Sequence, residues 1–377
     1  MSDRDGKLVE GKAVLPLELF FDLVFVLGVT QTVALVVEGH DARALGRTAL
    51  VLAMLWWGWT QFTWTANSID LRPARVRNAF FLGMGAALVM AVSVPSAFGG
   101  GGLWLVVGYV VLRAIGVWLH MTETTDPEVR ASARVFAAVS WVGPLVLLVG
   151  ALLDPPLRSW IWLAGGLLEI GSAAVVGSKA WHIQAGHFAE RHGLIYIVAL
   201  GEGIVAVGLL ASRQPFDAVL VFTMLLVVAG SAALWWSYFD SFAPYVEGHL
   251  RLADDSAEGP LARDAYSLGH FPMIVGVVLF AAAAEEVLSH PGDSLAGFSR
   301  VLFALSFGLA LLAQSAVLVR AGRELPFERL SAAFLIALIM VPQLEVRANI
   351  MMLAVVAVLV AALLVERSRD VAAAVRS

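Results

Sequence analysis

Long apolar stretches follow one another along this chain, and each ends at a short segment of charged residues, glycine or proline. Twelve of them approach the length of about 20 residues that a helix needs to cross a bilayer. They cover residues 15–37, 46–65, 78–98, 103–120, 133–152, 157–178, 193–212, 216–239, 268–289, 299–319, 329–344 and 349–366. The last two are short and are separated only by Glu345 and Arg347, so ten spans with a re-entrant hairpin stay open. The pattern predicts an all-α polytopic membrane protein with about twelve transmembrane helices.

The composition supports this prediction and excludes several classes of protein. Hydrophobic residues make up 59% of the 377 residues and charged residues 15%, and the mean hydropathy is +0.82. Soluble domains carry about 25% charged residues, so we expect membrane lipid around the protein and no soluble domain. A net charge of −5 without basic runs argues against a nucleic-acid partner. The absence of cysteine excludes disulfides and Cys-based metal sites. We expect no cofactor. The sequence is compatible with a homo-oligomer.

The positions of lysine and arginine predict the orientation. If the N-terminus is cytoplasmic, most of these residues fall in the cytoplasmic segments of the twelve-span arrangement. Because cytoplasmic loops of membrane proteins are enriched in lysine and arginine, both termini are predicted to be cytoplasmic. The charged segment 241–267 is predicted to be a cytoplasmic linker between helices.

Two short similarities at nearly the same offset indicate an internal duplication. Residues 55–59 are similar to 234–238, since both hold a tryptophan pair near the end of a span. Residues 22–28 align with 202–208, each beginning with an acid and ending with glycine. We therefore predict two parallel six-helix repeats, residues 1–182 and 183–377, as in several transporter folds. The alternative is a coincidence between tryptophan pairs at the membrane interface.

The first span contains two carboxylates, Glu18 and Asp22, four residues apart. Four residues is about one helical turn, so both side chains share a face. Acids within a span are unfavourable unless they face protein or water, so they indicate a functional site. The alternative for Glu18 is that it starts the helix at the headgroup boundary, where the helix dipole favours an acid.

The seventh span places His187, Arg191 and Glu202 on one helix face. Glu202 has a glycine on each side and no charged neighbour, so it must be protonated or paired. We predict that it binds a proton or cation, and the alternative is a hydrogen bond that only packs helices. Arg191 lies too far along the helix to reach Glu202, so its predicted partner is Asp22 or Asp240 from another helix.

Other polar residues fall at the cytoplasmic ends of spans. Glu190 enters the seventh span, Asp240 closes the eighth, and His270 opens the ninth. The histidines do not have the spacing of a metal-binding motif, so no metal site is predicted.

Four segments resemble the bacterial low temperature requirement protein A family: residues 18–26 with Thr30 and Gln31, residues 187–202, residues 235–240 and residues 269–272. His192 departs from the pattern, in which phenylalanine is more usual. The resemblance implies a multi-pass bacterial membrane protein linked by name to growth in the cold, without an established biochemical activity. It carries over these polar positions: Glu18, Asp22, Gln31, His187, Glu190, Arg191, Glu202, Asp240 and His270.

Residues 20–25 are also distantly similar to the Phe-Ser-Asp signature of a potassium-channel family with two six-helix repeats, although the serine is missing here. Together these features predict a transporter or channel for a small solute or ion in the bacterial plasma membrane. Proton coupling would use the intramembrane carboxylates. The alternatives are an intramembrane enzyme, whose cytoplasm-facing pocket of histidine, acidic and tryptophan residues acts on a lipid-like substrate, and a non-catalytic membrane sensor or assembly factor.

Overall fold

The computed structural model describes residues 12–124, 130, 134–135, 137–176, 183–254, 256–340 and 345–374. Within these residues the chain is helical and forms no strands. The main helices are α1 (Pro16–Gly39), α2 (Ala42–Ser68), α3 (Ala74–Ser93), α4 (Gly102–Glu123), α6 (Val142–Ala151), α7 (Pro155–Val176), α8 (Ala185–Ala211), α9 (Ala218–Trp236), α10 (Ala243–Leu252), α11 (Glu258–Ala262), α12 (His270–Ser289), α13 (Gly297–Arg320), α14 (Phe327–Met340) and α15 (Ala348–Ala374).

A helix occupies each of the twelve predicted stretches, and eight helical segments are both long and apolar enough to cross a membrane. Those eight contain α1, α3, α4, α8, α9, α12, α13 and α15. The short helices α6 and α14 have 10 and 14 residues. The 27 residues of α2 have the length for a span but hold many polar side chains. The all-helical membrane-type fold is therefore confirmed, with eight candidate spans among the described residues.

Two segments differ from the sequence prediction. Helix α8 begins at Ala185 rather than at residue 193, so His187 and Arg191 lie inside it. The predicted linker 241–267 is mostly helical, because it contains α10, α11 and two π-helical turns, Ser237–Phe242 and Arg263–Leu268. In α10 the charged Arg251 is exposed while the apolar Val246 and Leu250 are buried, which is the pattern of an amphipathic helix.

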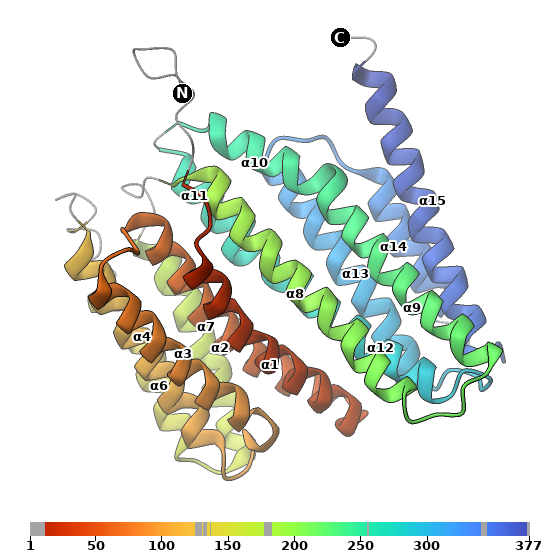
Figure 1. Cartoon of the computed structure of the whole chain (residues 1–377), viewed down its shortest axis with the longest axis horizontal. Helices are drawn as coiled ribbons and strands as arrows, with labels where there is room; N and C mark the ends of the chain where they lie inside the picture. Colours follow the sequence, from red (N-terminus) through yellow and green to blue (C-terminus); the bar gives the residue numbers. More distant parts are fainter. Residues whose placement is uncertain are drawn as a thin grey trace.

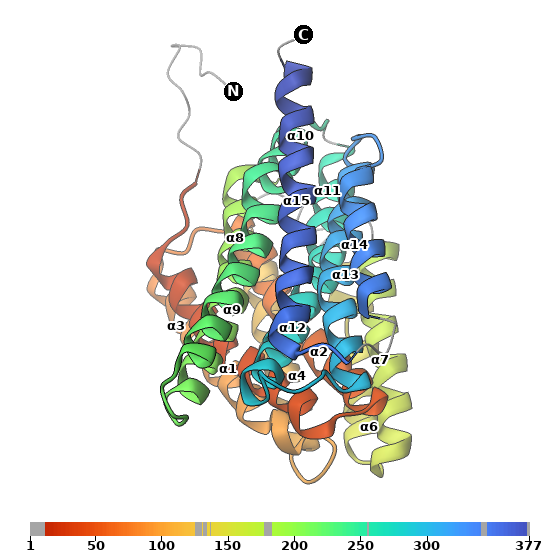
Figure 2. The same cartoon turned by 90° about the vertical axis from the view of Figure 1, so that its right-hand side faces the viewer.

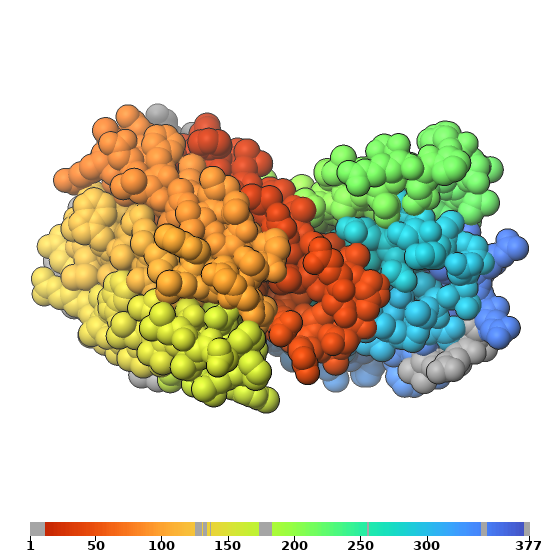
Figure 3. Space-filling view, turned by 90° about the horizontal axis from the view of Figure 1, so that it is seen from below, coloured from red at the N-terminus to blue at the C-terminus, as the bar shows by residue number. Residues whose placement is uncertain are grey.

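Figure 1 shows the helices up to α7 (red to yellow-green) on one side of the molecule and α8, α9 and α12 to α15 (green to blue) on the other, with α10 and α11 near the top. The start of α1 and the end of α15 lie toward the same end of the bundle, as Figure 2 also shows. Seen from below, α1 and the start of α2 lie between the two groups (Figure 3). Helix α1 packs against α8 and α12, so it forms much of the contact between them. The predicted boundary at residue 182 lies outside the described residues.

Small residues let the second group of helices pack closely. A Cβ atom on Gly276 of α12 would lie 2.5 Å from the carbonyl oxygen of Ser306 on α13. A Cβ atom on Gly308, two residues after Ser306 on α13, would meet no atom within 4 Å. This approach of two backbones is typical of membrane helices, where small residues form the interface.

Gly276→Ala is therefore expected to lower the free energy of unfolding by about 1–3 kcal/mol, because the backbones must separate. Gly308→Ala, the matched control, is expected to leave stability unchanged or slightly raised, since alanine favours the helix. Thermal unfolding of both variants in detergent checks this. Equal melting temperatures for the two variants would show that the α12–α13 contact is looser than described.

Candidate functional site

A buried ionic network joins α1 to α8. Glu18 Oε1 lies 2.9 Å from His187 Nε2 and 3.5 Å from Arg191 Nη1. Arg191 Nη2 lies 2.8 Å from Asp22 Oδ1, and each of these four side chains is at most 3% exposed. The predicted contact of Arg191 with Asp22 is confirmed. The arrangement follows from helical spacing, because each helix presents its two charged residues one turn apart on the face toward the other.

Helix α2 completes the network with uncharged side chains. Trp59 Nε1 donates to Asp22 Oδ1 at 2.7 Å, and the Thr63 hydroxyl lies 3.5 Å from Arg191 Nη2. Asn67 Nδ2 lies 3.0 Å from His187 Nδ1. These three residues are also spaced by four, so they form one polar stripe along α2. The site residues predicted from the sequence did not include them, and their four-residue spacing within one predicted span is the signal that could have found them.

The hydrogen bonds determine the protonation of His187. The backbone N–H of Gln184 donates to Asn67 Oδ1 at 3.0 Å, and Asn67 Nδ2 donates to the Gln184 carbonyl at 3.2 Å. The amide orientation is thereby set, and Nδ2 also donates to His187 Nδ1. His187 therefore carries its proton on Nε2 and donates it to Glu18, as a neutral imidazole assigned from this pattern.

Glu18 also starts α1. Its Oε2 accepts a hydrogen bond of 2.9 Å from the backbone N–H of Leu15, the residue that caps the helix, and Pro16 follows at the first helical position. A carboxylate at this position satisfies a free N–H and interacts well with the helix dipole. Glu18 therefore does both things that the sequence suggested. Its Oε2 accepts from the backbone at the start of α1, and its Oε1 contacts His187 in the network.

A cavity of about 1430 Å³ opens beside the network, and we call it the vestibule. His187 and Asn67 line its inner part, and Glu190 and Phe239 also line it. Its rim carries two ion pairs, Arg72 with Asp70 (2.9 Å) and Arg251 with Glu247 (2.5 Å).

Lys12 lies in the vestibule next to the network. Its ammonium group donates to the carbonyl oxygens of Ala66 and Ile69 at the end of α2. Burial lowers the pKa of Lys12, and the nearby carboxylates of Glu18 and Asp70 partly offset this. The vestibule thus presents charges of both signs to the entrance of the network.

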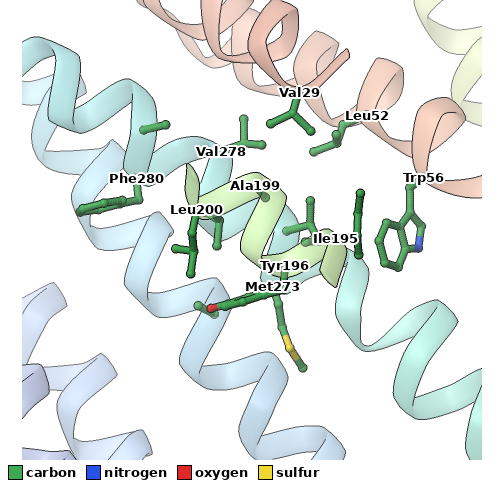
Figure 4. Close-up of a cluster of buried hydrophobic side chains, with 14 of the residues drawn as sticks. Val29, Leu52, Trp56, Ile195, Tyr196, Ala199, Leu200, Met273, Val278 and Phe280 are labelled. Atoms are coloured by element: carbon green, nitrogen blue, oxygen red, sulfur yellow. The ribbon is translucent and has the colours of Figure 1, made fainter. Parts of the chain in front are cut away.

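An apolar layer follows the network along α1 and α8. Figure 4 shows Val29 of α1, Leu52 of α2, and Ile195 and Ala199 of α8 among these side chains. All four are at most 5% exposed. Beyond this layer the Glu202 carboxyl of α8 lies near the Thr30 hydroxyl of α1, which donates to the Val26 carbonyl, and Glu285 of α12 is within electrostatic range. Arg191 and Glu202 are about 16 Å apart along the helix, from its rise per residue.

The remaining predicted site residues lie in different places. Gln31 is half-buried on α1, and Glu190 is exposed toward the vestibule. Asp240 is exposed in a π-helical turn beside α15, so it is not part of the network. His270 is buried among aromatic rings; its Nδ1 donates to the Ala265 carbonyl at 2.8 Å and its Nε2 accepts from Tyr238 at 2.7 Å. The sequence indicates how deep in a span each residue lies but not the direction in which its side chain points. The rotation of each helix therefore keeps these residues apart from the ionic network.

Comparison with known proteins agrees with the sequence pattern. The chain is 28% identical over 301 residues to an uncharacterized protein of Rhizobium meliloti (strain 1021). The alignment covers 74% of this chain and 70% of that protein. No solved structure is significantly similar to the present chain. Residues 13–365 match the family described as Bacterial low temperature requirement A protein. The match covers nearly the whole chain, so this membrane-type helical protein belongs to the bacterial low temperature requirement A (LtrA) family.

Proposed function

We propose that this protein is a transporter or channel for a small solute or ion, and that its route follows the contact of α1 with α8. The observation that carries the proposal is the order of groups along this contact. A vestibule leads to a buried ionic network, an apolar layer follows, and a second carboxyl, Glu202, lies beyond it. Ionisable groups within membrane helices mark ion and substrate pathways.

The arrangement corresponds to a closed state. The side chains of Val29, Leu52 and Ile195 fill the route between the two polar regions (Figure 4). Hydrophobic constrictions gate channels by excluding water, so separation of α1 from α8 would be the opening step. Glu18 and Asp22 would act at the cytoplasmic gate, and Glu202 would bind the transported proton or ion.

We also propose twelve spans in two parallel repeats, and the helix packing supports this. The first half has six main helices, α1, α2, α3, α4, α6 and α7. Its first helix packs on its second and third (α1–α2, α1–α3), its third on its fourth (α3–α4), and its fifth on its sixth (α6–α7). The second half has the main helices α8, α9, α12, α13, α14 and α15. Helices at the same positions pack together there (α8–α9, α8–α12, α12–α13 and α14–α15). Substrate routes in transporters with such repeats lie at the interface between the halves, which here contains α1 and α8.

Each half also contains a buried ion pair between two of its helices. In the first half Arg113 pairs with Glu169 at 3.1 Å and bonds to the amide of Gln61. In the second half Arg329 pairs with Glu366 at 2.9 Å and bonds to the amide of Gln314. Both glutamates lie on the sixth helix of their half, α7 and α15. The two arginines lie on different helices of their halves, Arg113 on the fourth (α4) and Arg329 on the fifth (α14), so the repeat is argued from the helix packing and not from these pairs.

The proposed location is the plasma membrane with both termini cytoplasmic, and cysteine labelling tests the orientation. The natural chain has no cysteine, and Gly100 and Ser256 are exposed at opposite ends of the proposed spans. A cysteine at position 100 is expected to react with an impermeant maleimide from outside whole cells. A cysteine at position 256 is expected to react only after permeabilisation. The reverse pattern would contradict the orientation.

Flux into proteoliposomes tests the function itself. With an imposed gradient of protons, Na⁺ or K⁺, the wild-type protein is expected to dissipate at least one gradient faster than empty liposomes. Glu202→Gln keeps the size of the side chain but removes the ionisable group, and should slow this flux by about tenfold or more, a barrier increase of about 1.4 kcal/mol. Glu38→Gln, on the exposed end of α1, is the control and should match wild type. Wild-type liposomes that behave like empty ones for all three ions and for small metabolites would contradict the proposal.

A further inference from the structure

The two carboxyl oxygens of Asp22 have unequal surroundings. Oδ1 accepts two hydrogen bonds, from Arg191 Nη2 at 2.8 Å and from Trp59 Nε1 at 2.7 Å. Oδ2 is buried and has no hydrogen-bond partner among the described residues. An ionised carboxylate accepts hydrogen bonds at both oxygens, and a buried charged oxygen without a donor is strongly destabilising. A neutral hydroxyl at Oδ2 also lacks a partner, but it costs less there than a charged oxygen without a donor, so the surroundings of Oδ2 favour the protonated carboxyl.

The charges around Asp22 lead to the same assignment. The charged groups that act on it are Arg191 of α8 and Glu18 of its own helix. Since His187 is neutral in this network, two carboxylates share one guanidinium in the part that excludes water. Lys12 acts on Glu18 and Arg191 from the vestibule. One proton on Asp22 leaves Glu18 and Arg191 as a balanced pair, whereas without it a net negative charge would be buried.

The other helices that pack on α1 place no further charge at Asp22. Helix α2 contributes Trp59 and Thr63, and α3 contributes the Phe80 ring beside Phe21. The acids of α12 act at the opposite end, Glu285 on Glu202 and Glu286 on His40.

A proton suits this position better than a metal cation. Metal ions such as Na⁺ or Ca²⁺ need several oxygen ligands around them, but Trp59 and Arg191 offer only N–H donors to Asp22. Among the described residues, no three histidine, aspartate or glutamate side chains converge as metal ligands. Aromatic rings pack beside Asp22, where Phe21 contacts Phe25 and Phe62.

We propose that Asp22 is a second proton-binding carboxyl, besides Glu202, and that the closed structure holds its proton on Oδ2. The inference rests on the proposed function, because release of this proton to water in the vestibule would couple it to transport. Release leaves two carboxylates competing for Arg191, which favours separation of α1 from α8 and entry of water. Binding restores the balanced pair of Glu18 and Arg191 and closes the contact.

Infrared difference spectroscopy on the purified full-length protein tests this without any transport. At neutral pH the wild type is expected to show a C=O stretching band of a protonated carboxylic acid that shifts in D₂O. Asp22→Asn should remove one component of this band, distinct from any component that Glu202 gives, while Asp240→Asn, at an exposed site, should leave the band unchanged. Trp59→Phe removes the donor to the C=O oxygen, so the Asp22 component should move to higher frequency but persist.

The Trp59→Phe variant keeps the test decisive even if Asp22→Asn does not fold. An Asp22→Asn spectrum that keeps every component of the wild-type band, or a Trp59→Phe spectrum in which no component moves, overturns the inference. A band that disappears from the wild type on adding Na⁺ or K⁺ at constant pH also overturns it, because the site would then bind a metal cation. Loss of one component in Asp22→Asn without flux in liposomes would contradict only the transport function. Flux that needs Glu202, with every component retained in Asp22→Asn, would contradict only the proton site at Asp22.

Discussion

Arg191→Met is expected to destabilise the protein more than any other single change in the network, by about 3–5 kcal/mol of unfolding free energy. Arg191 is fully buried and is the guanidinium that contacts both Glu18 and Asp22. Its removal leaves buried carboxylate charge without a cation, and methionine cannot replace the lost hydrogen bonds. The measurement is unfolding in detergent by heat or by increasing denaturant. Arg213→Met, on the exposed segment after α8, is the control and should change stability little.

A triple variant separates the ion pairing from simple packing. Arg191→Met combined with Glu18→Gln and Asp22→Asn removes all three ionisable groups and retains side chains of similar size. Replacing a whole buried ion network by neutral residues is often much less harmful than removing one partner. The triple variant is therefore expected to recover a large part of the stability lost in Arg191→Met. A triple variant as unstable as the single one would show that Arg191 acts by its volume and not by its charge.

Ile195→Asn is expected to make the closed protein leak. Ile195 is buried in the apolar layer between the ionic network and Glu202 (Figure 4). An amide at this position would hold water in the route, and lowering the barrier by about 1.4 kcal/mol raises the rate tenfold. Proteoliposomes with this variant should dissipate an ion gradient roughly tenfold faster than wild type.

Leu209→Asn is the matched control for the leak, because Leu209 lies on the same helix but is 60% exposed, on the face toward lipid. It should lower stability without increasing flux, since a polar residue on the lipid face opens no route. Equal flux from Ile195→Asn and wild-type liposomes would place the route elsewhere in the protein.

Much of the site could be predicted from the sequence because helical periodicity is a local property. The four-residue spacing of Glu18 with Asp22, and of His187 with Arg191, places each pair on one face wherever the helix lies. The partner of Arg191 was predicted for an energetic reason: a buried cation needs an acid at its own depth, and few acids were available. The 2.8 Å contact with Asp22 agrees with that reasoning.

Other features depended on how the helices are rotated and joined. Asp240 lies at a similar depth in the sequence pattern, but the structure turns it outward beside α15. Trp59 and Asn67 carry no charge and gave no signal by composition, yet they set the hydrogen bonding of Asp22 and the tautomer of His187. The segment 241–267 was predicted as a linker from its charge, and packing of its apolar face made it helical.

The sequence by itself determined that this is a membrane-type protein of helices with acids, histidine and arginine on particular helix faces, because hydropathy and helical spacing depend only on neighbouring residues. Only the tertiary structure decided which faces meet. It joined α1, α2 and α8 around a balanced ionic network, placed the vestibule beside it, and separated Glu202 behind an apolar layer. The physical reason is that helix rotation and pairing follow from side-chain packing between segments distant in the sequence. The spacing of residues within one helix does not say which other helix its polar face will meet.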